Sequence, residues 1–286
     1  QCSFNYIVKH DGETYEFREI LELHRFLLDD PLPGELIQRI GLYLHLTLGL
    51  SYYKLFAPGS VILKEKLSKE EAHFFTQLYA KGLGEFYYRN KLGLTHAPEF
   101  ASDPDLKRTP FDLPRQNPKS ILVGIGGGKD SIVAMELLKE QGHKVRAFVL
   151  ETQKPYPVID AVVRTTGVSV LKVKRIIDPK LFESIPDSYN GHIPISAVYS
   201  FTAYLCAVLY GFSYVVVGNE HSSNFGNIEY QGIEINHQWS KSSEYEVLFQ
   251  NLAKHSLTPD VTYFSLLRPF HEIRIIEMFT KYPQYF

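Results

Sequence analysis

The sequence predicts an α/β protein in which a doubly wound parallel sheet follows a smaller, mostly helical N-terminal domain. In the second half of the chain, apolar runs rich in β-branched residues alternate with helical stretches, which is typical of βαβ units. In the first half, helical periodicity dominates. The expected strands lie at about 120–125, 145–150, 168–173 and 214–218, and the expected helices at about 131–141, 157–166 and 195–210.

The domain boundaries follow from this change of pattern. Five prolines between positions 96 and 120, without a sustained apolar period, indicate a linker. We therefore expect a mostly helical domain at residues 1–100, a proline-rich linker at 101–118 and a second domain at 119–286.

The first domain is expected to begin with a hairpin around the turn Asp11-Gly12. Its two short strands lie at 3–9 and 14–17. Apolar periodicity then predicts helices at 19–28, 35–50 and 68–90. Ser68 and Glu71, at the start of the last helix, have the spacing of a capping box.

The charge of the chain argues against nucleic acid as a partner. Thirty Lys and Arg side chains stand against 32 Asp and Glu, so a net charge of −2 leaves no global positive field. Cys2 and Cys206 lie far apart without CxxC spacing, which favours neither a disulfide framework nor a thiolate zinc site. We expect a small-molecule partner and a cytoplasmic location.

Residues 193–218 contain no charged side chain and are long enough to suggest a membrane helix. Pro194 opens the segment, however, a turn-like stretch at 211–213 divides it, and 214–218 is a β-branched run. We interpret it as a buried helix followed by a buried strand and expect no membrane contact. No signal peptide is visible, and the missing initiator Met places the expected true start upstream.

A glycine-rich loop at 124–131, GIGGGKDS, joins an expected strand to an expected helix. It is not a Walker P-loop, because that motif requires glycine in place of Val123 and a hydroxyl residue in place of Asp130. The dinucleotide fingerprint fails because Lys129 stands where its third glycine belongs. What remains is a turn whose amides, with the helix N-terminus, converge on an anion. The alternative is an ordinary turn capped by Asp130 or Ser131.

The side chains of this loop narrow the choice of anion. Lys129 adds a mobile positive charge and Ser131 adds a hydroxyl group. The Asp130 carboxylate would repel a phosphate unless Mg²⁺ lay between them. The loop therefore indicates a magnesium-bound nucleoside triphosphate.

A polar cluster follows the run 214–218, at the end of a strand where open α/β sheets place their ligands. It consists of Asn219, Glu220, His221, Ser222, Ser223 and Asn224. We expect more than a turn here, with His221 either a site residue or an ordinary surface or core histidine.

Two later segments add candidate residues. The stretch NHQWSKS contains Asn236, His237, Trp239, Ser240 and Lys241. Alternatively, Ser240 to Ser243 cap the next helix while Trp239 fills the core. Arg268, just before Pro269 and an amphipathic stretch, either meets a phosphate or carboxylate or lies on the surface. Lys174 and Arg175 are weaker candidates for anion binding than for a solvated strand end.

The GGGKDS loop resembles the SGGxDS loop of the PP-loop ATP pyrophosphatases, with Gly126 in place of the leading serine. Those enzymes cleave ATP to AMP and pyrophosphate and adenylate a substrate oxygen. The resemblance implies a PP-loop, HUP-like domain. It also implies a pyrophosphate site formed by Gly126, Gly127, Gly128, Lys129, Asp130 and Ser131, with adenosine near Leu150 and Glu151.

Four motifs in this order, GGGKDS, GNEHSSNFGN, NHQWSKSSEYE and YFSLLRPFHEI, resemble the narrower MurL family of ATP-dependent UDP-N-acetylmuramoyl-L-alanyl-L-glutamate epimerases. The resemblance is strong over 119–286 and loose before it. Family members continue into a cysteine-containing segment, so a C-terminal truncation is expected. The family implies ATP and Mg²⁺ as cofactors, UDP-MurNAc-L-Ala-L-Glu as the substrate and a role in peptidoglycan precursor synthesis.

The resemblance also implies roles for the polar residues. We expect His221, His237 and Lys241 to transfer protons, and Asp130 with Glu220 to hold Mg²⁺. The expected substrate-binding residues are Asn219, Ser222, Asn224, Asn236, Trp239, Ser240 and Arg268. The N-terminal domain is expected to help hold the UDP-muramoyl end.

Two other functions fit the same motifs. One is a different PP-loop enzyme that activates a carboxylate with ATP and forms a C–N bond. The other is a regulatory module that binds ATP without cleaving it.

Overall fold

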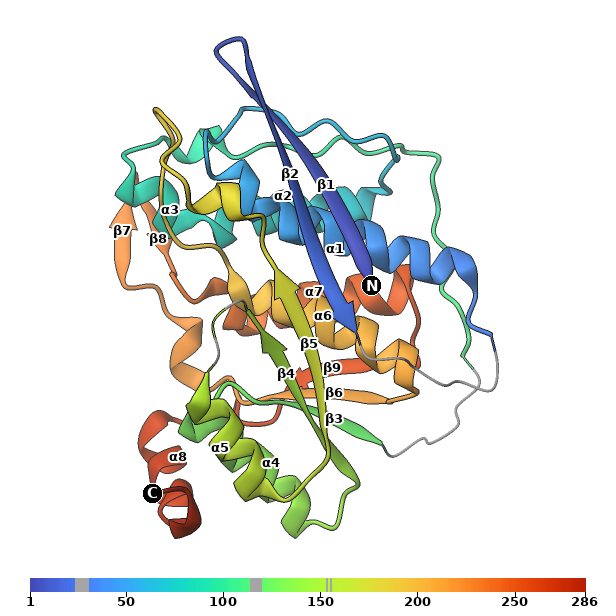
Figure 1. The fold of residues 1–286 in the computed structure, drawn as a ribbon, viewed down its shortest axis with the longest axis vertical. Helices are drawn as coiled ribbons and strands as arrows, with labels where there is room; N and C mark the ends of the chain where they lie inside the picture. The colour runs from blue at the N-terminus through green and yellow to red at the C-terminus, as the bar shows by residue number, and fades with distance from the viewer. Residues whose placement is uncertain (24–30, 114–119, 153, 155) are drawn as a thin grey trace.

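The computed structural model describes residues 1–23, 31–113, 120–152, 154 and 156–286. Its centre is a seven-stranded sheet with the order β1-β2-β5-β4-β3-β6-β9 (Figure 1). The strands are β1 (Cys2–His10), β2 (Glu13–Leu23), β3 (Ile121–Gly124), β4 (Val145–Glu151), β5 (Val170–Ile176), β6 (Tyr214–Val217) and β9 (Thr262–Ser265). From β5 to β9 all pairs are parallel, while β1 and β2 join one edge as an antiparallel hairpin.

Helices cover both faces of this sheet. They are α1 (Gly34–Tyr53), α2 (Lys69–Gly82), α3 (Gly84–Arg89), α4 (Lys129–Glu140), α5 (Pro157–Thr166), α6 (Ile195–Tyr210), α7 (Ser243–Ser256) and α8 (Glu272–Phe279). Short 3-10 helices are η1 (Leu94–His96), η2 (Pro179–Phe182), η3 (His221–Asn224), η4 (Trp239–Lys241) and η5 (Pro283–Tyr285), and a separate hairpin consists of β7 (Ile228–Tyr230) and β8 (Ile233–Ile235).

The doubly wound class predicted from the sequence is confirmed. Residues alternate along each parallel strand, so that Val123 packs in a cluster with α4 and α5 while Leu122 packs in a second cluster with α6 and α7. The chain runs from β3 outward through β4 to β5, then returns to β6 on the other side of β3. The winding direction therefore reverses between β3 and β6, where ligand crevices of open α/β sheets form.

The N-terminal helices form an outer layer on α6 and α7 (Figure 1). Aromatic rings join the layers: Tyr43 of α1 lies 6.1 Å from Phe201, and Phe74 of α2 lies 6.5 Å from Phe249, between ring centroids. One hydrophobic cluster therefore contains residues from both sides of the expected linker. The division at 101–118 remains a prediction, and its residues 114–118 lie outside the described residues.

The expected helix at 19–28 is wrong where it can be compared. Residues 19–23 belong to β2, whose burial alternates with the two-residue period of a strand, and 24–28 lie outside the described residues. Glu19 hides the strand pattern in the sequence, because a charged residue stands at a buried position. Its carboxylate accepts hydrogen bonds from Arg175 at 2.5 Å and from the Tyr52 hydroxyl at 2.8 Å. A buried charge requires such partners.

Arg175 is therefore neither an anion-binding group nor part of a solvated strand end. Its side chain is 2% exposed and donates to Glu19 and to the Ser51 hydroxyl. These hydrogen bonds link β5 to β2 of the N-terminal hairpin and to α1. Lys174, its neighbour on β5, is exposed.

Several local predictions are confirmed. Ser68 and Glu71 form a capping box at α2, and the uncharged stretch 193–218 contains α6 followed by β6. Within the described parts of the chain, no helix combines the length and hydrophobicity needed to cross a membrane.

Candidate functional site

The glycine loop and the polar cluster lie at the same edge of the sheet. They follow β3 and β6, which are parallel neighbours, so their carboxyl ends point the same way. Gly218 brings them into contact: a Cβ atom there would lie 2.6 Å from the Asp130 carbonyl oxygen. Only glycine permits this approach, because real Cβ atoms do not come that close to backbone.

The glycine loop is shaped by backbone geometry. Gly127 has a φ of +83°, the left-handed region that favours glycine, and a Cβ atom there would lie 3.0 Å from Ile159. Ser131 Oγ donates to the Gly128 carbonyl at 2.9 Å and accepts from the Gly126 N–H at 3.4 Å. The N-cap of α4 is Gly128 and no side chain caps this helix, so the expected cap by Asp130 or Ser131 is wrong.

The first-turn amides of α4 are thus left to a ligand or solvent, and its N-terminal dipole favours an anion. The Tyr199 hydroxyl lies 2.7 Å from the Phe148 carbonyl, in the middle of β4, and 3.2 Å from the carbonyl of Ile125, which follows β3. Burial raises the pKa of Tyr199, so it stays a donor.

Lys129 lies between two carboxylates. Its Nζ is 3.0 Å from Asp130 Oδ1 and 3.1 Å from Glu272 Oε1 at the start of α8. Burial lowers the pKa of Lys129, but hydrogen bonds and charge from the two carboxylates outweigh it and leave the pKa raised. Asp130 Oδ1 is buried and has no hydrogen bond of good geometry among the described residues, although Lys129 Nζ lies 3.0 Å away.

The expected adenosine residues lie at the end of β4. Leu150 is 9% exposed, and Glu151 accepts from Lys172 Nζ at 2.7 Å. Lys172 also reaches Asp160 of α5 at 2.7 Å, and these two carboxylates raise its pKa. Whether adenosine binds here remains a prediction.

In the polar cluster, Glu220 is the N-cap of η3. Its carboxylate accepts from the Ser222 N–H at 2.9 Å and from the Ser222 hydroxyl. The Asn219 carbonyl accepts a hydrogen bond from the Ser265 hydroxyl. The expected metal and substrate contacts of these residues remain predictions.

His221 points toward the start of α8. Its ring centroid lies 4.4 Å from that of His271, at an interplanar angle of 67°, and 5.4 Å from that of Phe225. The His221 N–H donates to the Phe270 carbonyl at 3.0 Å. Because Glu272 follows His271, the start of α8 contacts both the polar cluster and the glycine loop.

The NHQWSKS segment packs beside η3. Asn236 Nδ2 donates to the Ser223 carbonyl at 2.8 Å, and Asn224 Oδ1 accepts from the Ser243 N–H at 2.7 Å. His237 Nδ1 lies 3.1 Å from Asn227 Oδ1. The structure thus brings this segment and η3 together.

Trp239 and Ser240 are buried, with exposed fractions of 4% and 5%. The Trp239 indole N–H donates to Glu244 at 2.8 Å, and its ring packs on Tyr245. Trp239 therefore fills the core, as in the alternative interpretation. The N-cap of α7 is Ser242, whose hydroxyl accepts from the Tyr245 N–H.

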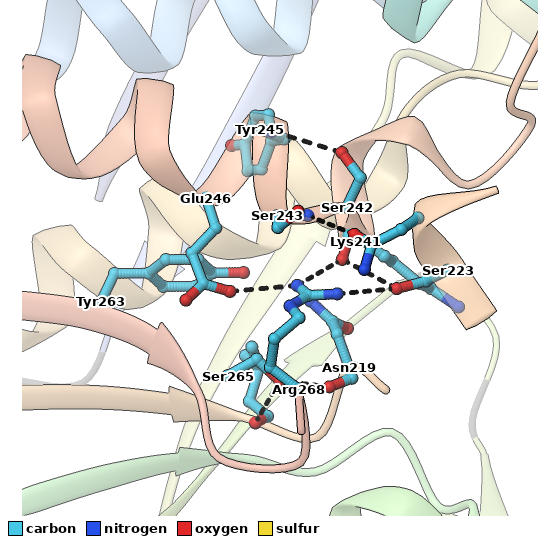
Figure 2. A network of polar contacts seen from close by, with 12 residues as sticks. Asn219, Ser223, Lys241, Ser242, Ser243, Tyr245, Glu246, Tyr263, Ser265 and Arg268 are labelled. Atoms are coloured by element: carbon cyan, nitrogen blue, oxygen red, sulfur yellow. Dashed lines mark hydrogen bonds and ion pairs between the residues drawn. The ribbon is translucent and has the colours of Figure 1, made fainter. Parts of the chain in front are cut away.

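Arg268 lies at the centre of a network of polar contacts (Figure 2). Its Nη1 donates to the Glu220 carbonyl at 3.1 Å and to Ser223 Oγ at 2.9 Å. Its Nη2 donates to the Lys241 carbonyl at 2.6 Å and to Glu246 at 3.0 Å. With a side-chain exposure of 17%, it is not a surface residue.

Three residues of this region were missed by sequence reasoning: Glu246, His271 and Glu272. Glu246 was not among the expected site residues, whereas its carboxylate accepts a hydrogen bond from Arg268. The sequence did carry a signal for the other two, because they follow Pro269 directly before an amphipathic stretch.

The residues present would fit Mg²⁺ only together with oxygen atoms from a bound ligand. No group of three or more His, Cys, Asp or Glu side chains forms a metal site in the described ranges. Mg²⁺ commonly binds one or two carboxylates together with substrate phosphates, and Asp130 can supply such a ligand beside the loop.

These features define a class: a doubly wound α/β protein with a glycine loop, suited to an anion, at the point where the winding reverses. The chain belongs to the MurL family, because the family model of the MurL N-terminal domain matches residues 1–266.

Three curated relatives, each named UDP-N-acetyl-alpha-D-muramoyl-L-alanyl-L-glutamate epimerase, share about a third of their aligned residues with the chain. The protein from a Micromonospora strain is 36% identical over all of this chain and 63% of its own length. That from Salinispora tropica is 36% identical over 98% and 61%, and that from Xanthomonas oryzae pv. oryzae is 35% identical over 87% and 54%. The chain thus spans between half and two thirds of these relatives.

Among solved structures, a predicted subunit of tRNA methyltransferase from Methanocaldococcus jannaschii matches 56% of this chain and 75% of its own, at 17% identity and a TM-score of 0.37. NAD+ synthetase from Burkholderia pseudomallei matches 86% and 93%, at 10% identity and a TM-score of 0.23. These scores are too low to support any argument about this chain.

Proposed function

We propose that this chain is the nucleotide-binding part of an ATP-dependent epimerase. It inverts the terminal L-Glu of UDP-MurNAc-L-Ala-L-Glu to D-Glu during peptidoglycan precursor synthesis. The observation that carries the proposal is the 36% identity, along the whole chain, to a relative with this name. The use of ATP is supported by the glycine loop and by the free N-terminus of α4.

The loop residues fit the pyrophosphate part of Mg·ATP. Gly127 and Gly218 leave no room for side chains, so backbone amides can approach an anion closely. Lys129 and Ser131 would contact phosphate oxygens, and Asp130 would hold Mg²⁺. Glu220 is the weaker candidate for a second metal ligand, since Ser222 already donates to its carboxylate.

ATP solves a specific chemical problem of this reaction. Removing the α-proton beside a carboxylate is hard, because the enolate adds negative charge next to the existing one. Transfer of adenylate to that carboxylate releases pyrophosphate and gives a mixed anhydride whose carbonyl oxygen can accept the charge. A modest base then removes the proton, an acid returns one to the opposite face, and hydrolysis frees the product and AMP.

His221, His237 and Lys241 are the proposed proton-transfer groups, and His271 joins them through its contact with His221. The two imidazoles are in van der Waals contact, so a substrate carbon does not fit between them. They serve one face of Cα, and the group for the other face comes from the NHQWSKS segment. The proposed substrate contacts are Asn219, Ser222, Asn224, Asn236, Ser240 and the N-terminal helices.

A cytoplasmic location is part of the proposal. Cys2 and Cys206 are both free thiols, Cys206 in the core, which suits a reducing compartment.

The test is to incubate the protein with Mg·ATP and UDP-MurNAc-L-Ala-L-Glu, to follow pyrophosphate release, and to determine the chirality of glutamate after acid hydrolysis. D-Glutamate that forms only with ATP supports the epimerase. The matched control is the same reaction with UDP-MurNAc-L-Ala, which lacks the glutamate.

Pyrophosphate release without D-glutamate would support a different PP-loop reaction, such as C–N bond formation. ATP binding without pyrophosphate release, in a protein that includes the segments found in its longer relatives, would contradict catalysis and favour a nucleotide-binding module.

A further inference from the structure

The Arg268 guanidinium joins segments that are distant in sequence. Arg268 itself lies between β9 and α8. Its contacts are to η3, through the Glu220 carbonyl and Ser223, to η4, through the Lys241 carbonyl, and to α7, through Glu246 (Figure 2). Arginine offers five N–H donors in a rigid plane, so one side chain can hold several acceptors at fixed angles.

We propose that Arg268, paired with Glu246, is a positioning residue. It fixes η3 and η4 relative to each other and so sets the distance between His221, on η3, and Lys241, on η4. The inference rests on the proposed function for its catalytic consequence, but its structural part is independent of any activity.

The surroundings of Arg268 favour this role over substrate binding. Both Nη atoms already donate to protein groups, and Nε is buried without a hydrogen-bond partner among the described residues. Glu246 is 14% exposed, so withdrawing Arg268 toward a substrate would leave a mostly buried carboxylate unpaired. Leaving one partner of a mostly buried ion pair unsatisfied is strongly unfavourable, which opposes the movement.

Neighbouring contacts point to the same junction. Ser223 Oγ lies 2.7 Å from the Glu220 carbonyl and 3.1 Å from the Lys241 carbonyl, and Asn236 donates to the Ser223 carbonyl. Two carbonyl oxygens from different segments, Glu220 and Lys241, therefore share Arg268 and Ser223 as donors. These hydrogen bonds can all exist only while η3 and η4 keep their relative position. We therefore expect the contacts of Arg268 and Ser223 to form and break together.

The direct test uses the single tryptophan. Trp239 lies in η4, two residues from the Lys241 carbonyl that Arg268 holds. In Arg268→Lys, the positive charge remains, but the planar guanidinium with its two Nη donors is lost. We expect a red shift of the Trp239 emission and an acrylamide quenching constant raised by about twofold or more, since quenching reports on how often a buried ring is exposed.

The control is Arg274→Lys on the neighbouring helix α8. Arg274 forms an exposed pair with Glu277, with side chains 58% and 56% exposed, so its loss should leave Trp239 unchanged. Unchanged Trp239 emission and quenching in Arg268→Lys would overturn the proposal, whether or not the protein is an epimerase.

Kinetics then separate positioning from binding. In Arg268→Lys, kcat for D-glutamate formation should fall by about 10²-fold, because small misplacements of reacting groups are costly, while KM for the dipeptide changes by less than about threefold. A large rise of KM with kcat unchanged would assign Arg268 to the substrate instead.

Glu246→Gln provides a second variant should the lysine variant fold poorly. Its amide keeps the shape and one acceptor for Arg268 but loses the charge. We expect the quenching constant of Trp239 to rise and kcat to fall, each by less than in Arg268→Lys. An Arg268→Lys/Glu246→Gln double variant whose effects simply add would contradict a shared unit, since coupled residues are non-additive.

Discussion

The glycine loop and the Arg268 junction lie near each other but are built differently. The loop, Gly126 to Ser131, takes its shape from consecutive residues: a left-handed glycine, a helix N-terminus and a local serine. The junction takes its shape from contacts between the Arg268 side chain and groups 22 to 48 residues away in sequence, two of which are backbone carbonyls. The backbone of the part proposed to bind ATP is therefore shaped mainly by local sequence, whereas the part proposed to move protons depends on tertiary contacts.

The comparison makes its strongest prediction at Asp130. Asp130→Asn keeps the shape of the side chain but removes the proposed carboxylate ligand of Mg²⁺. We expect pyrophosphate release to fall by about 10³-fold, because a metal ion supplies several kcal/mol of charge stabilisation. Trp239 emission should not change, since the junction is separate. Glu277→Gln on the surface of α8 is the control. Turnover equal to that of the unchanged protein would remove Asp130 from metal binding.

A second prediction tests whether the loop depends on backbone contact. In Gly218→Ala, the added Cβ would lie 2.6 Å from the Asp130 carbonyl oxygen, so β6 or α4 must shift. We expect a loss of about 1–3 kcal/mol in the free energy of unfolding, and weaker ATP binding.

The matched control is Gly126→Ala, where a Cβ would meet no described atom within 4 Å. Its free energy of unfolding should change by less than about 1 kcal/mol. Denaturant titrations of both variants compare the two sites. An equal loss of unfolding free energy in Gly218→Ala and Gly126→Ala would show that Gly218 has room for a Cβ atom beside α4.

The third prediction concerns the link between the two regions. His271→Gln removes the imidazole that contacts His221 while the glycine loop stays intact. Deuterium uptake at the glutamyl Cα in D₂O should slow by about tenfold, less than the effect of losing a general base outright. Pyrophosphate release should change little. If both rates fall together, His271 acts on ATP rather than on the proton.

The same contrast explains what the sequence could predict. The strands and helices of residues 121–217 could be predicted because the spacing of apolar residues and the positions of glycine and proline determine structure over a few neighbouring residues. The glycine loop could be recognised for the same reason. The hairpin β1–β2 was expected as a pair, but not its addition to the main sheet, which depends on pairing with β5 far along the chain.

Buried charges were the main source of error. Glu19 made part of a strand resemble a helix, Arg175 was expected mainly at a solvated strand end, and Arg268 was expected either at an anion or on the surface. In each case the decisive fact is a distant partner, Glu19 for Arg175 and Glu246 for Arg268. A single sequence gives no sign of which charges will pair, because the pairing is decided by tertiary structure.

The smallest effect is expected at Glu272, which shares Lys129 with Asp130. In Glu272→Gln, Lys129 is freer to meet phosphate, so ATP should bind about two- to fivefold more tightly, the scale of one exposed ion pair. Isothermal titration with a non-hydrolysable ATP analogue measures this, with Glu277→Gln as the control on the same helix.

The pH dependence of that contact has a definite sign. The pKa of Lys129 in the folded protein is raised above its ordinary value of 10.5. The stabilisation of the folded state by the ion pairs of Lys129 is therefore complete below pH 10.5 and is lost as the pH rises through the folded pKa. Between pH 7 and 9 the difference in ATP affinity between the unchanged protein and Glu272→Gln should therefore stay constant. A difference that disappears within this range would mean that another group, titrating there, controls Lys129. The loop would then depend on tertiary contacts as much as the Arg268 junction does.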